Sequence, residues 1–404
     1  MLSSIRVLEL CDETGVLAGK ILADLGADVV KVEAPGGDLD ARRPPHLGGI
    51  RDPERSLAWL ALNTNKRGIT LDPEPSAGRA LLHRLLDWAD VLLDTLAPGT
   101  LEARGLGWAM MQREHPRLVR CAITPFGQTG PHSQLRARDL VVVAMGGNAS
   151  MTGDPDRPPL RCTLPTSYYH AAPEAVLGVL MALQARESTG RGQLVDVSLQ
   201  ECQLGTLLGG PGIHGASPQP PRRSGARTGR TREIWPARDG HVSFGLRGGA
   251  ARVPGLRAIV AWMDEAGAAP AWLRDTDWDR FSPNALDAGE LARLEAAFGA
   301  FFASRSMREL YEGALARRIL LAPCNDAHEV LAHPQLRHRE LFTTIEYPEF
   351  GASIEHPAFF ARGSGAPVGV RRRAPRIGEH NGEVYGALGL EREELTKLAA
   401  EGVI

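Results

Sequence analysis

The chain has 404 residues, a length that predicts two or three domains. Hydrophobic residues make up 43% and charged residues 23%, a composition that supports a folded core and excludes disordered, collagen-like and coiled-coil proteins. The 46 basic and 48 acidic residues leave a formal net charge of -2, so no long-range field attracts nucleic acid or an anionic membrane. We therefore expect neither of them as a partner.

The cysteines and the first residues indicate the compartment. The five cysteines stand singly, at Cys11, Cys121, Cys162, Cys202 and Cys324. They form no CxxC or CxxH spacing, which argues against a disulfide framework and a structural zinc site. His132, His170 and His214 also lack ligand spacing, so no metal is predicted. The opening MLSSIRVLEL is too short and too charged for a signal peptide, and no run of about 18 apolar residues exists. These features predict a cytoplasmic globular protein.

The first forty residues predict a strand, a helix and a second strand. Ile5–Leu10 is rich in apolar residues, Gly15–Leu25 has helical spacing, and Asp28–Glu33 is rich in β-branched residues. Further elements are predicted as a strand ending at Leu60–Asn63, a helix over Ala77–Trp88, and strands at Asp90–Asp94 and Leu118–Thr124. Strands that alternate with helices in this way indicate a mostly parallel sheet covered on both faces, and hence an α/β fold.

The middle of the chain predicts a long helix and then a boundary. Apolar residues at helical intervals predict a helix over Ala171–Arg186, with Pro173 in its first turn, where proline is tolerated. A glycine-rich turn and a strand at Leu194–Leu199 follow. Residues 209–232 combine prolines, glycines and five arginines, a composition typical of an extended connection. We therefore expect a large domain over 1–208, a linker over 209–232 and a smaller α+β domain over 233–324.

Six stretches of the chain resemble family III of the CoA-transferases, which includes formyl-CoA transferase, carnitine CoA-transferase and α-methylacyl-CoA racemase. They are Ile21–Asp38, Leu62–Asp72, Ala89–Gly107, Phe126–Pro131, Glu187–Glu201 and His333–Phe342. The resemblance implies a Rossmann-like large domain built from both chain ends, with 325–404 returning to it, and two chains interlocked like links. It also implies CoA or acyl-CoA as substrate, with no tightly bound cofactor.

The resemblance places the family's nucleophile ten or eleven positions before Gly178. Family chemistry uses an aspartate there, whose carboxylate attacks the acyl-CoA to form a mixed anhydride and then an enzyme thioester. In this chain those positions are Tyr168 and Ser167, and the only carboxylate of the segment Cys162–Val176, Glu174, comes about two helical turns late. We therefore predict no catalytic residue in this chain, since a hydroxyl does not form that anhydride.

Eight residues are predicted to contact CoA. Lys66 and Arg67 are cations suited to its phosphates, with surface ion pairs as the alternative. Gly15 and Val16 open the first helix, where free N–H groups favour an anion, although a tight turn explains them equally well. Arg42 contacts either the ligand or only solvent. The remaining candidates lie in the family stretches and are Asn63, Arg104 and Gln128.

Three functions follow from this combination of features. In the first, the chain is the non-catalytic subunit of a heteromeric CoA-transferase and interlocks with an aspartate-bearing paralogue. The resemblance implies succinyl-CoA as donor and (R)-benzylsuccinate as acceptor, in anaerobic breakdown of toluene. In the second, the chain is a homodimeric CoA-ester binding protein. In the third, it is an enzyme of altered mechanism, such as a racemase-like or dehydratase activity.

Overall fold

The computed structural model describes residues 1–206, 210–216, 222–359 and 361–404. The chain divides into two compact units, which are described separately below. The larger unit comprises Met1–Ala149, Arg161–Pro218 and Pro334–Ile404, and the smaller unit comprises Ser150–Leu160 and Gln219–His333. The larger unit therefore takes residues from both ends of the chain. Among the described residues, no helix combines the length and the apolar character that crossing a membrane requires.

The larger unit is built on a six-stranded parallel sheet in the order β3-β2-β1-β4-β5-β6. Its strands are β1 (Arg6–Leu10), β2 (Asp28–Glu33), β3 (Arg67–Thr70), β4 (Val91–Asp94), β5 (Val119–Thr124) and β6 (Leu194–Ser198). Leu8 lies opposite Val30 on one side and Leu92 on the other, and all three are fully buried. This order is the Rossmann arrangement, so the predicted α/β class and the parallel sheet are confirmed.

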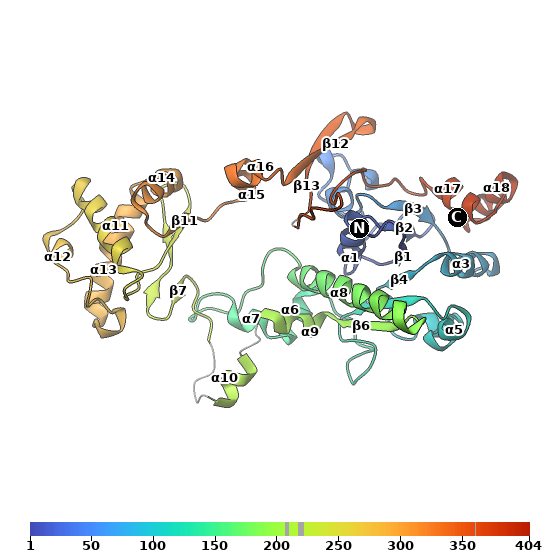
Figure 1. Ribbon diagram of the computed structural model, residues 1–404, viewed down its shortest axis with the longest axis horizontal. Helices are drawn as coiled ribbons and strands as arrows, with labels where there is room; N and C mark the ends of the chain where they lie inside the picture. Colours follow the sequence, from blue (N-terminus) through green and yellow to red (C-terminus); the bar gives the residue numbers. More distant parts are fainter. Residues whose placement is uncertain (207–209, 217–221, 360) are drawn as a thin grey trace. The chain divides into compact units, whose positions relative to one another are not determined.

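Helices cover both faces of this sheet (Figure 1). On one face, α1 (Val16–Asp24) and α8 (Thr166–Thr189) pack against alternate strand residues such as Val7. On the other face, the next strand residues, such as Leu8, pack against four helices. Those helices are α3 (Ser76–Trp88), α5 (Trp108–Glu114), α17 (Asn381–Ala387) and α18 (Arg392–Ala400). Burial on both faces explains why neighbouring residues of one strand are both apolar, as Val7 and Leu8 are in β1 and Val29 and Val30 are in β2.

Shorter elements complete the larger unit. They are α2 (Leu57–Leu62), α4 (Thr100–Ala103), α6 (Asp139–Met145), α9 (Leu199–Cys202), α10 (Gly210–Ala216) and α16 (Pro334–His338), with the antiparallel hairpin β12 (Phe342–Tyr347) and β13 (Ala352–Pro357). The short helix α7 (Asn148–Met151) has two residues in each unit. The α10 helix lies inside the predicted linker. Residues 209 and 217–221 of that linker fall outside the described residues.

The smaller unit is a three-stranded antiparallel sheet packed against helices. Its strands run in the order β11-β10-β9, as β9 (Ile234–Pro236), β10 (His241–Phe244) and β11 (Leu321–Pro323), and β7 (Arg227–Thr228) pairs with β8 (Thr231–Arg232). Its helices are α11 (Val253–Glu265), α12 (Ala271–Arg274), α13 (Ala288–Ala303), α14 (Met307–Arg317) and α15 (Ala327–Ala332). The core is aromatic, with Trp235, Phe244 and Phe302 in edge-to-face contact.

Two predicted elements of the larger unit differ from the structure. The strand predicted to end at Leu60–Asn63 is wrong, because this stretch forms the helix α2. The hydroxyl of Ser56 accepts a hydrogen bond from the Trp59 N–H and caps the first turn, which favours a helix. The helix predicted from Ala171 begins at Thr166 instead, so Pro173 lies in its interior rather than in its first turn. Burial of the residues around that proline against α1 and the sheet offsets the lost hydrogen bond.

Candidate active site

A cleft of about 720 Å³ opens at the carboxyl ends of β1, β2 and β4. Six of the residues that line it are Cys11, Asp12, Ala34, Asp38, Thr95 and Leu96. The order of the sheet reverses between β1 and β4, and open α/β sheets bind their ligands beside such a reversal. The cleft is therefore the principal ligand site that the geometry of the larger unit provides.

The cleft lining carries two cations, Lys31 and Arg104. The ammonium of Lys31 is buried, hydrogen-bonds the carbonyl of Cys11 and lies 3.9 Å from the Glu9 carboxylate. Arg104 pairs with Glu74 at 2.6 Å, and its side chain is 26% exposed. Because an exposed ion pair exchanges readily with other partners, Arg104 is the cation of the lining that an anionic ligand can engage. Of the eight predicted CoA contacts, only Arg104 lines this cleft.

Three predicted contacts meet around the ammonium of Lys66. This Nζ lies 3.0 and 2.8 Å from the two Glu9 carboxylate oxygens, 2.9 Å from the Val16 carbonyl and 3.0 Å from the Asn63 side-chain oxygen. The side chain is fully buried, and burial lowers the pKa of Lys66 to about 8. The predicted cluster therefore exists, but its cation is occupied by groups of the protein itself and ties α1 to the sheet.

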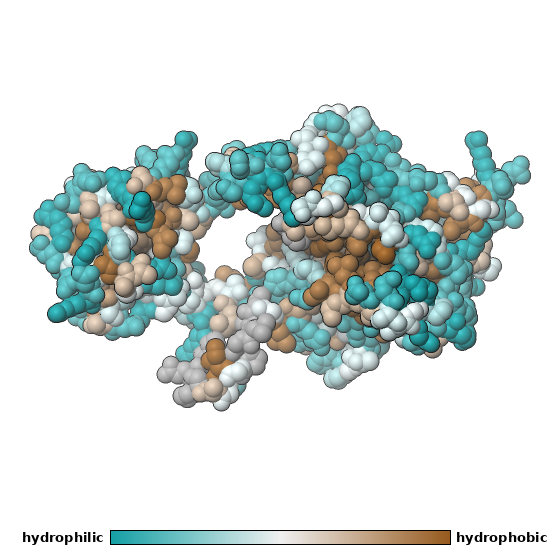
Figure 2. Space-filling view, in the orientation of Figure 1, coloured by the Kyte–Doolittle hydropathy of each residue, from teal (hydrophilic) through white to brown (hydrophobic). Residues whose placement is uncertain are grey.

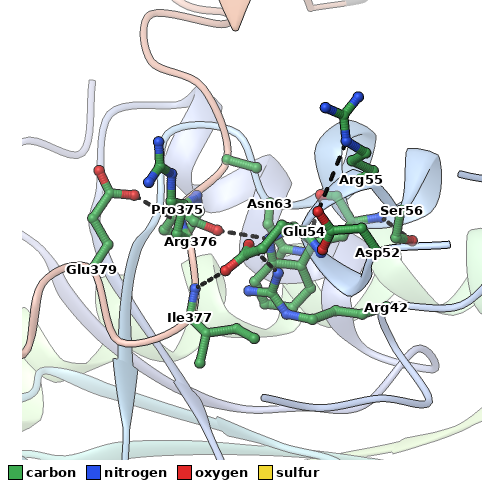
Figure 3. Close-up of polar contacts among 12 residues, drawn as sticks. Arg42, Asp52, Glu54, Arg55, Ser56, Asn63, Pro375, Arg376, Ile377 and Glu379 are labelled. Carbon is green, nitrogen blue, oxygen red and sulfur yellow. Dashed lines mark hydrogen bonds and ion pairs between the residues drawn. The ribbon is translucent and has the colours of Figure 1, made fainter. Parts of the chain in front are cut away.

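Arg42 is held in the same way by the carboxylates of Glu33 and Glu54, and Figure 3 shows the contacts around Glu54. Its Nε and Nη2 donate to Glu33 at 2.7 and 2.8 Å, and its Nη1 donates to Glu54 at 2.8 Å. Its guanidinium carbon also lies 3.7 Å from the centre of the Trp59 ring. The second oxygen of Glu54 accepts from the Ile377 N–H at 3.0 Å, so this network joins the two ends of the chain.

Arg67 lies at the amino end of β3, at the edge of the sheet opposite the cleft. It pairs with Asp28 at 3.0 and 2.6 Å and with Glu383 at 3.0 Å. Both partners belong to the larger unit, where they connect β2, β3 and α17. The side chains of Arg67 and Lys66 therefore have different partners and do not form one cationic site, although the two residues are adjacent in the sequence.

Gly15 and Gln128 have packing contacts that explain them locally. A Cβ atom on Gly15 would stand 2.7 Å from the Cγ2 of Thr95, so a glycine lets α1 approach the wall of the cleft. The backbone N–H of Gln128 donates to both carboxylate oxygens of Asp196, at 3.1 and 3.0 Å. The side-chain nitrogen of Gln128 is buried and has no hydrogen-bond partner among the described residues. Ligand binding by either residue remains a prediction.

The position at which the sequence predicts the family's nucleophile holds two hydroxyl groups that already form hydrogen bonds. Tyr168 is 3% exposed, and its hydroxyl accepts a hydrogen bond from the Asp139 N–H at 3.1 Å. Burial raises the pKa of Tyr168, so its phenol stays protonated. The N–H and hydroxyl of Ser167 both donate to one oxygen of Asp139, at 3.0 and 2.8 Å. The buried phenol of Tyr168 is therefore not activated as a nucleophile, and the hydroxyl of Ser167 is engaged in holding Asp139 at the start of α8.

The space beside Tyr168 is also small. A cavity of about 60 Å³ remains there, lined in part by Tyr169, Glu13 and Arg43. Glu13 pairs with Arg43 and, at 2.6 Å, with Arg138, so its carboxylate is already engaged by two guanidinium groups of the chain. Glu174 is exposed and lines a different pocket with Asp196, so it does not face the space beside Tyr168.

Two features of the site escaped the sequence analysis. The first is the pairing of Glu9 and Lys31, which face one another in the register of β1 and β2. The signal for this pairing was an acidic residue in one predicted strand and a basic residue in the next, each flanked by apolar residues. The second is Asp139, whose other carboxylate oxygen is buried, lies 3.7 Å from Arg161 and has no hydrogen-bond partner among the described residues. No local pattern indicated that this residue meets Ser167.

The sheet order and the cleft at its reversal define a Rossmann-like α/β protein with a ligand site at the carboxyl edge. The chain belongs to CoA-transferase family III, whose defining sequence pattern matches residues 2–381.

Individual relatives agree with this assignment. The chain is 31% identical to the succinyl-CoA:(R)-benzylsuccinate CoA-transferase subunit BbsE of Thauera aromatica and 32% identical to the succinyl-CoA–D-citramalate CoA-transferase of Chloroflexus aurantiacus. Both comparisons cover 100% of this chain and 98% of the relative. Among solved structures, a CaiB/BaiF family protein from Brucella suis superposes with a TM-score of 0.79 at 28% identity. That superposition covers 96% of this chain and 98% of the other.

Proposed function

We propose that this chain is the non-catalytic subunit of a heteromeric family III CoA-transferase, in which a paralogue supplies the nucleophilic aspartate. The observation that carries the proposal is the state of Tyr168, which is buried, hydrogen-bonded and held protonated at the nucleophile's position. Family chemistry needs a carboxylate oxygen to attack the acyl carbonyl as the CoA thiolate leaves. The thiolate then displaces the acid to form an enzyme thioester. A buried phenol does neither step.

The substrates we propose are succinyl-CoA as donor and (R)-benzylsuccinate as acceptor. One of the relatives above is named as a subunit of a transferase with this pair, and the other is also named for succinyl-CoA. The cleft at the reversal of the sheet is the place we propose for a CoA ester in this chain, with Arg104 as its cationic contact. We also propose a cytoplasmic location, which the five free cysteines support.

An exposed apolar surface supports a partner chain. In α6, Leu140, Val141 and Met145 are between 42% and 57% exposed, and in α8 Leu177 and Met181 are 53% and 63% exposed. Figure 2 shows hydrophobic residues gathered in the region of α8. Apolar surface of this kind on one face favours burial against another protein. We propose that the paralogue covers it in an interlocked pair.

A second candidate is an active enzyme of altered mechanism, and Asp139 is the observation that favours it. Its second carboxylate oxygen, which lies 3.7 Å from Arg161 and accepts no hydrogen bond among the described residues, is an acidic group close to the proposed position of the nucleophile. A structural role for Asp139 argues against this second candidate. Its Oδ1 accepts two hydrogen bonds from Ser167 at the start of α8, so the carboxylate caps that helix.

The test is to find which chain carries CoA. The full chain is purified alone and together with a family III paralogue that keeps the aspartate. Each preparation is incubated with succinyl-CoA, and the intact mass of every chain is measured. We expect transfer activity only in the mixture, with the CoA adduct on the paralogue. A CoA adduct on this chain would refute the subunit assignment, and its loss in Asp139→Asn would establish the second candidate. Binding of CoA without turnover in any mixture would instead favour the CoA-ester binding protein.

A further inference from the structure

Two histidines and a glutamate gather on the outside of the larger unit. His83 lies on α3, while Glu114 ends α5 and His115 follows it. Each side chain offers one ligand atom, and these three atoms lie within 4.8 Å of one another. The two imidazole rings are 6.4 Å apart, centre to centre. None of the three residues lines the cleft described above.

The imidazole of His115 is oriented in the manner of a metal ligand. Its Nδ1 lies 3.1 Å from an oxygen of Asp87, and since an ionised carboxylate only accepts, Nδ1 carries the hydrogen. The lone pair of a neutral ring is then on Nε2. This atom is buried in a side chain that is 8% exposed and has no hydrogen-bond partner among the described residues. A carboxylate that holds the far nitrogen of a histidine is the usual second contact of a metal-binding imidazole.

The local structure brings the remaining groups to the same point. His83 and Asp87 are one turn apart on α3, so the helix presents the ligand and the orienting carboxylate on one face. The N–H of His115 donates to the Met111 carbonyl at 2.7 Å, which fixes the backbone at the end of α5. Glu114 is 44% exposed and pairs with Arg113 at 2.6 Å, an arrangement that a metal ion can displace.

We propose that His83, Glu114 and His115 bind one divalent transition-metal ion, with water completing the coordination and Asp87 orienting His115. Two imidazoles and a carboxylate suit Zn²⁺ and its neighbours rather than Mg²⁺ or Ca²⁺, which prefer oxygen ligands alone. Tetrahedral binding at about 2.0 Å requires ligand atoms about 3.3 Å apart. The partly exposed side chains of His83 and Glu114 have room to move inward to that distance. The ion ties α3 to α5 across one face of the sheet.

Metal binding is tested on the full chain after treatment with EDTA and alkylation of exposed thiols. Zn²⁺ is titrated by calorimetry and Co²⁺ by visible absorption. We expect one ion per chain, the absorption of tetrahedral Co²⁺ and a higher thermal midpoint with metal. His115→Gln is expected to remove this binding, and Asp87→Asn, which keeps all three ligands, is expected to weaken it about tenfold to a hundredfold.

The matched control is His328→Gln, which changes an exposed histidine of the smaller unit and is expected to bind with unchanged affinity. Equal Zn²⁺ affinity in the unchanged chain and in His115→Gln would overturn the proposal. If His115→Gln does not fold, Zn²⁺ affinity is measured in Asp87→Asn and Glu114→Gln, which change exposed side chains. Unchanged affinity in both variants would also overturn the proposal. Circular dichroism of each variant separates loss of the site from loss of the fold.

Discussion

Replacing Arg42 by methionine is expected to destabilise the larger unit by about 4–6 kcal/mol. The guanidinium supplies two hydrogen bonds to Glu33, a residue that is 3% exposed. Without them, this buried carboxylate keeps a hydrogen bond from the Asp38 N–H at 2.9 Å. Removing one partner of a buried ion pair costs about 3–5 kcal/mol, and the lost stacking on Trp59 adds about 1 kcal/mol. Glu54 is partly exposed and regains water, so it adds little.

The measurement is urea unfolding, with hydrogen exchange of peptides from β2 assigning the transition to the larger unit. Arg43→Met is the matched control, because its neighbouring guanidinium is 46% exposed and its ion pair is worth less than about 1 kcal/mol. The double variant Arg42→Met with Glu33→Gln should lose less stability than Arg42→Met alone, since no buried charge is left unpaired. If Arg42→Met and Arg43→Met unfold within 1 kcal/mol of one another, the reasoning fails.

Two other substitutions test the packing and the titration of the larger unit. Gly19→Ala should lower stability by about 1–3 kcal/mol, because its Cβ would stand 1.7 Å from the Glu9 carboxylate. Gly386→Ala, at a helical glycine with open space, is the control, and equal thermal midpoints for the two would contradict this explanation. Burial lowers the pKa of His356 to about 4. Between pH 6.5 and 4, His356 is therefore protonated in the unfolded chain and neutral in the folded chain. Stability should therefore fall by up to about 3 kcal/mol as the pH drops through this range. His356→Phe should show a shallower fall in thermal midpoint, and identical slopes would exclude His356 as a cause.

Sequence patterns correctly predicted the strands that are buried along most of their length. β2 and β5 are rich in β-branched and other apolar residues because helices cover both faces of the sheet, and such stretches are visible without a structure. The six residues of α2 are also an apolar run, but their length fits either a strand or a helix. The capping bond from Ser56 decided between the two. Similarly, α8 begins before Pro173 because packing offsets the hydrogen bond that this proline removes, and local sequence rules do not include such packing.

The candidate site divides in the same way. The resemblance of the sequence identified the family, because a family match depends on residue identity at matched positions, and it predicts an absent aspartate at Tyr168. It did not show whether a cation is free. Lys66 and Arg42 have the chemistry of phosphate ligands, yet both are buried against carboxylates. Glu9, the partner of Lys66, comes from a separate strand.

By itself, the sequence determined the class of fold and the family. The tertiary structure decided what each remaining polar group is bonded to, since a side chain's partners come from segments that only folding brings together. That is why Asp139 beside Ser167 and Asp87 beside His115 became visible only in three dimensions. The type of a residue fixes which hydrogen bonds it can form. Which of them it does form depends on its burial and on neighbours that are distant in the chain.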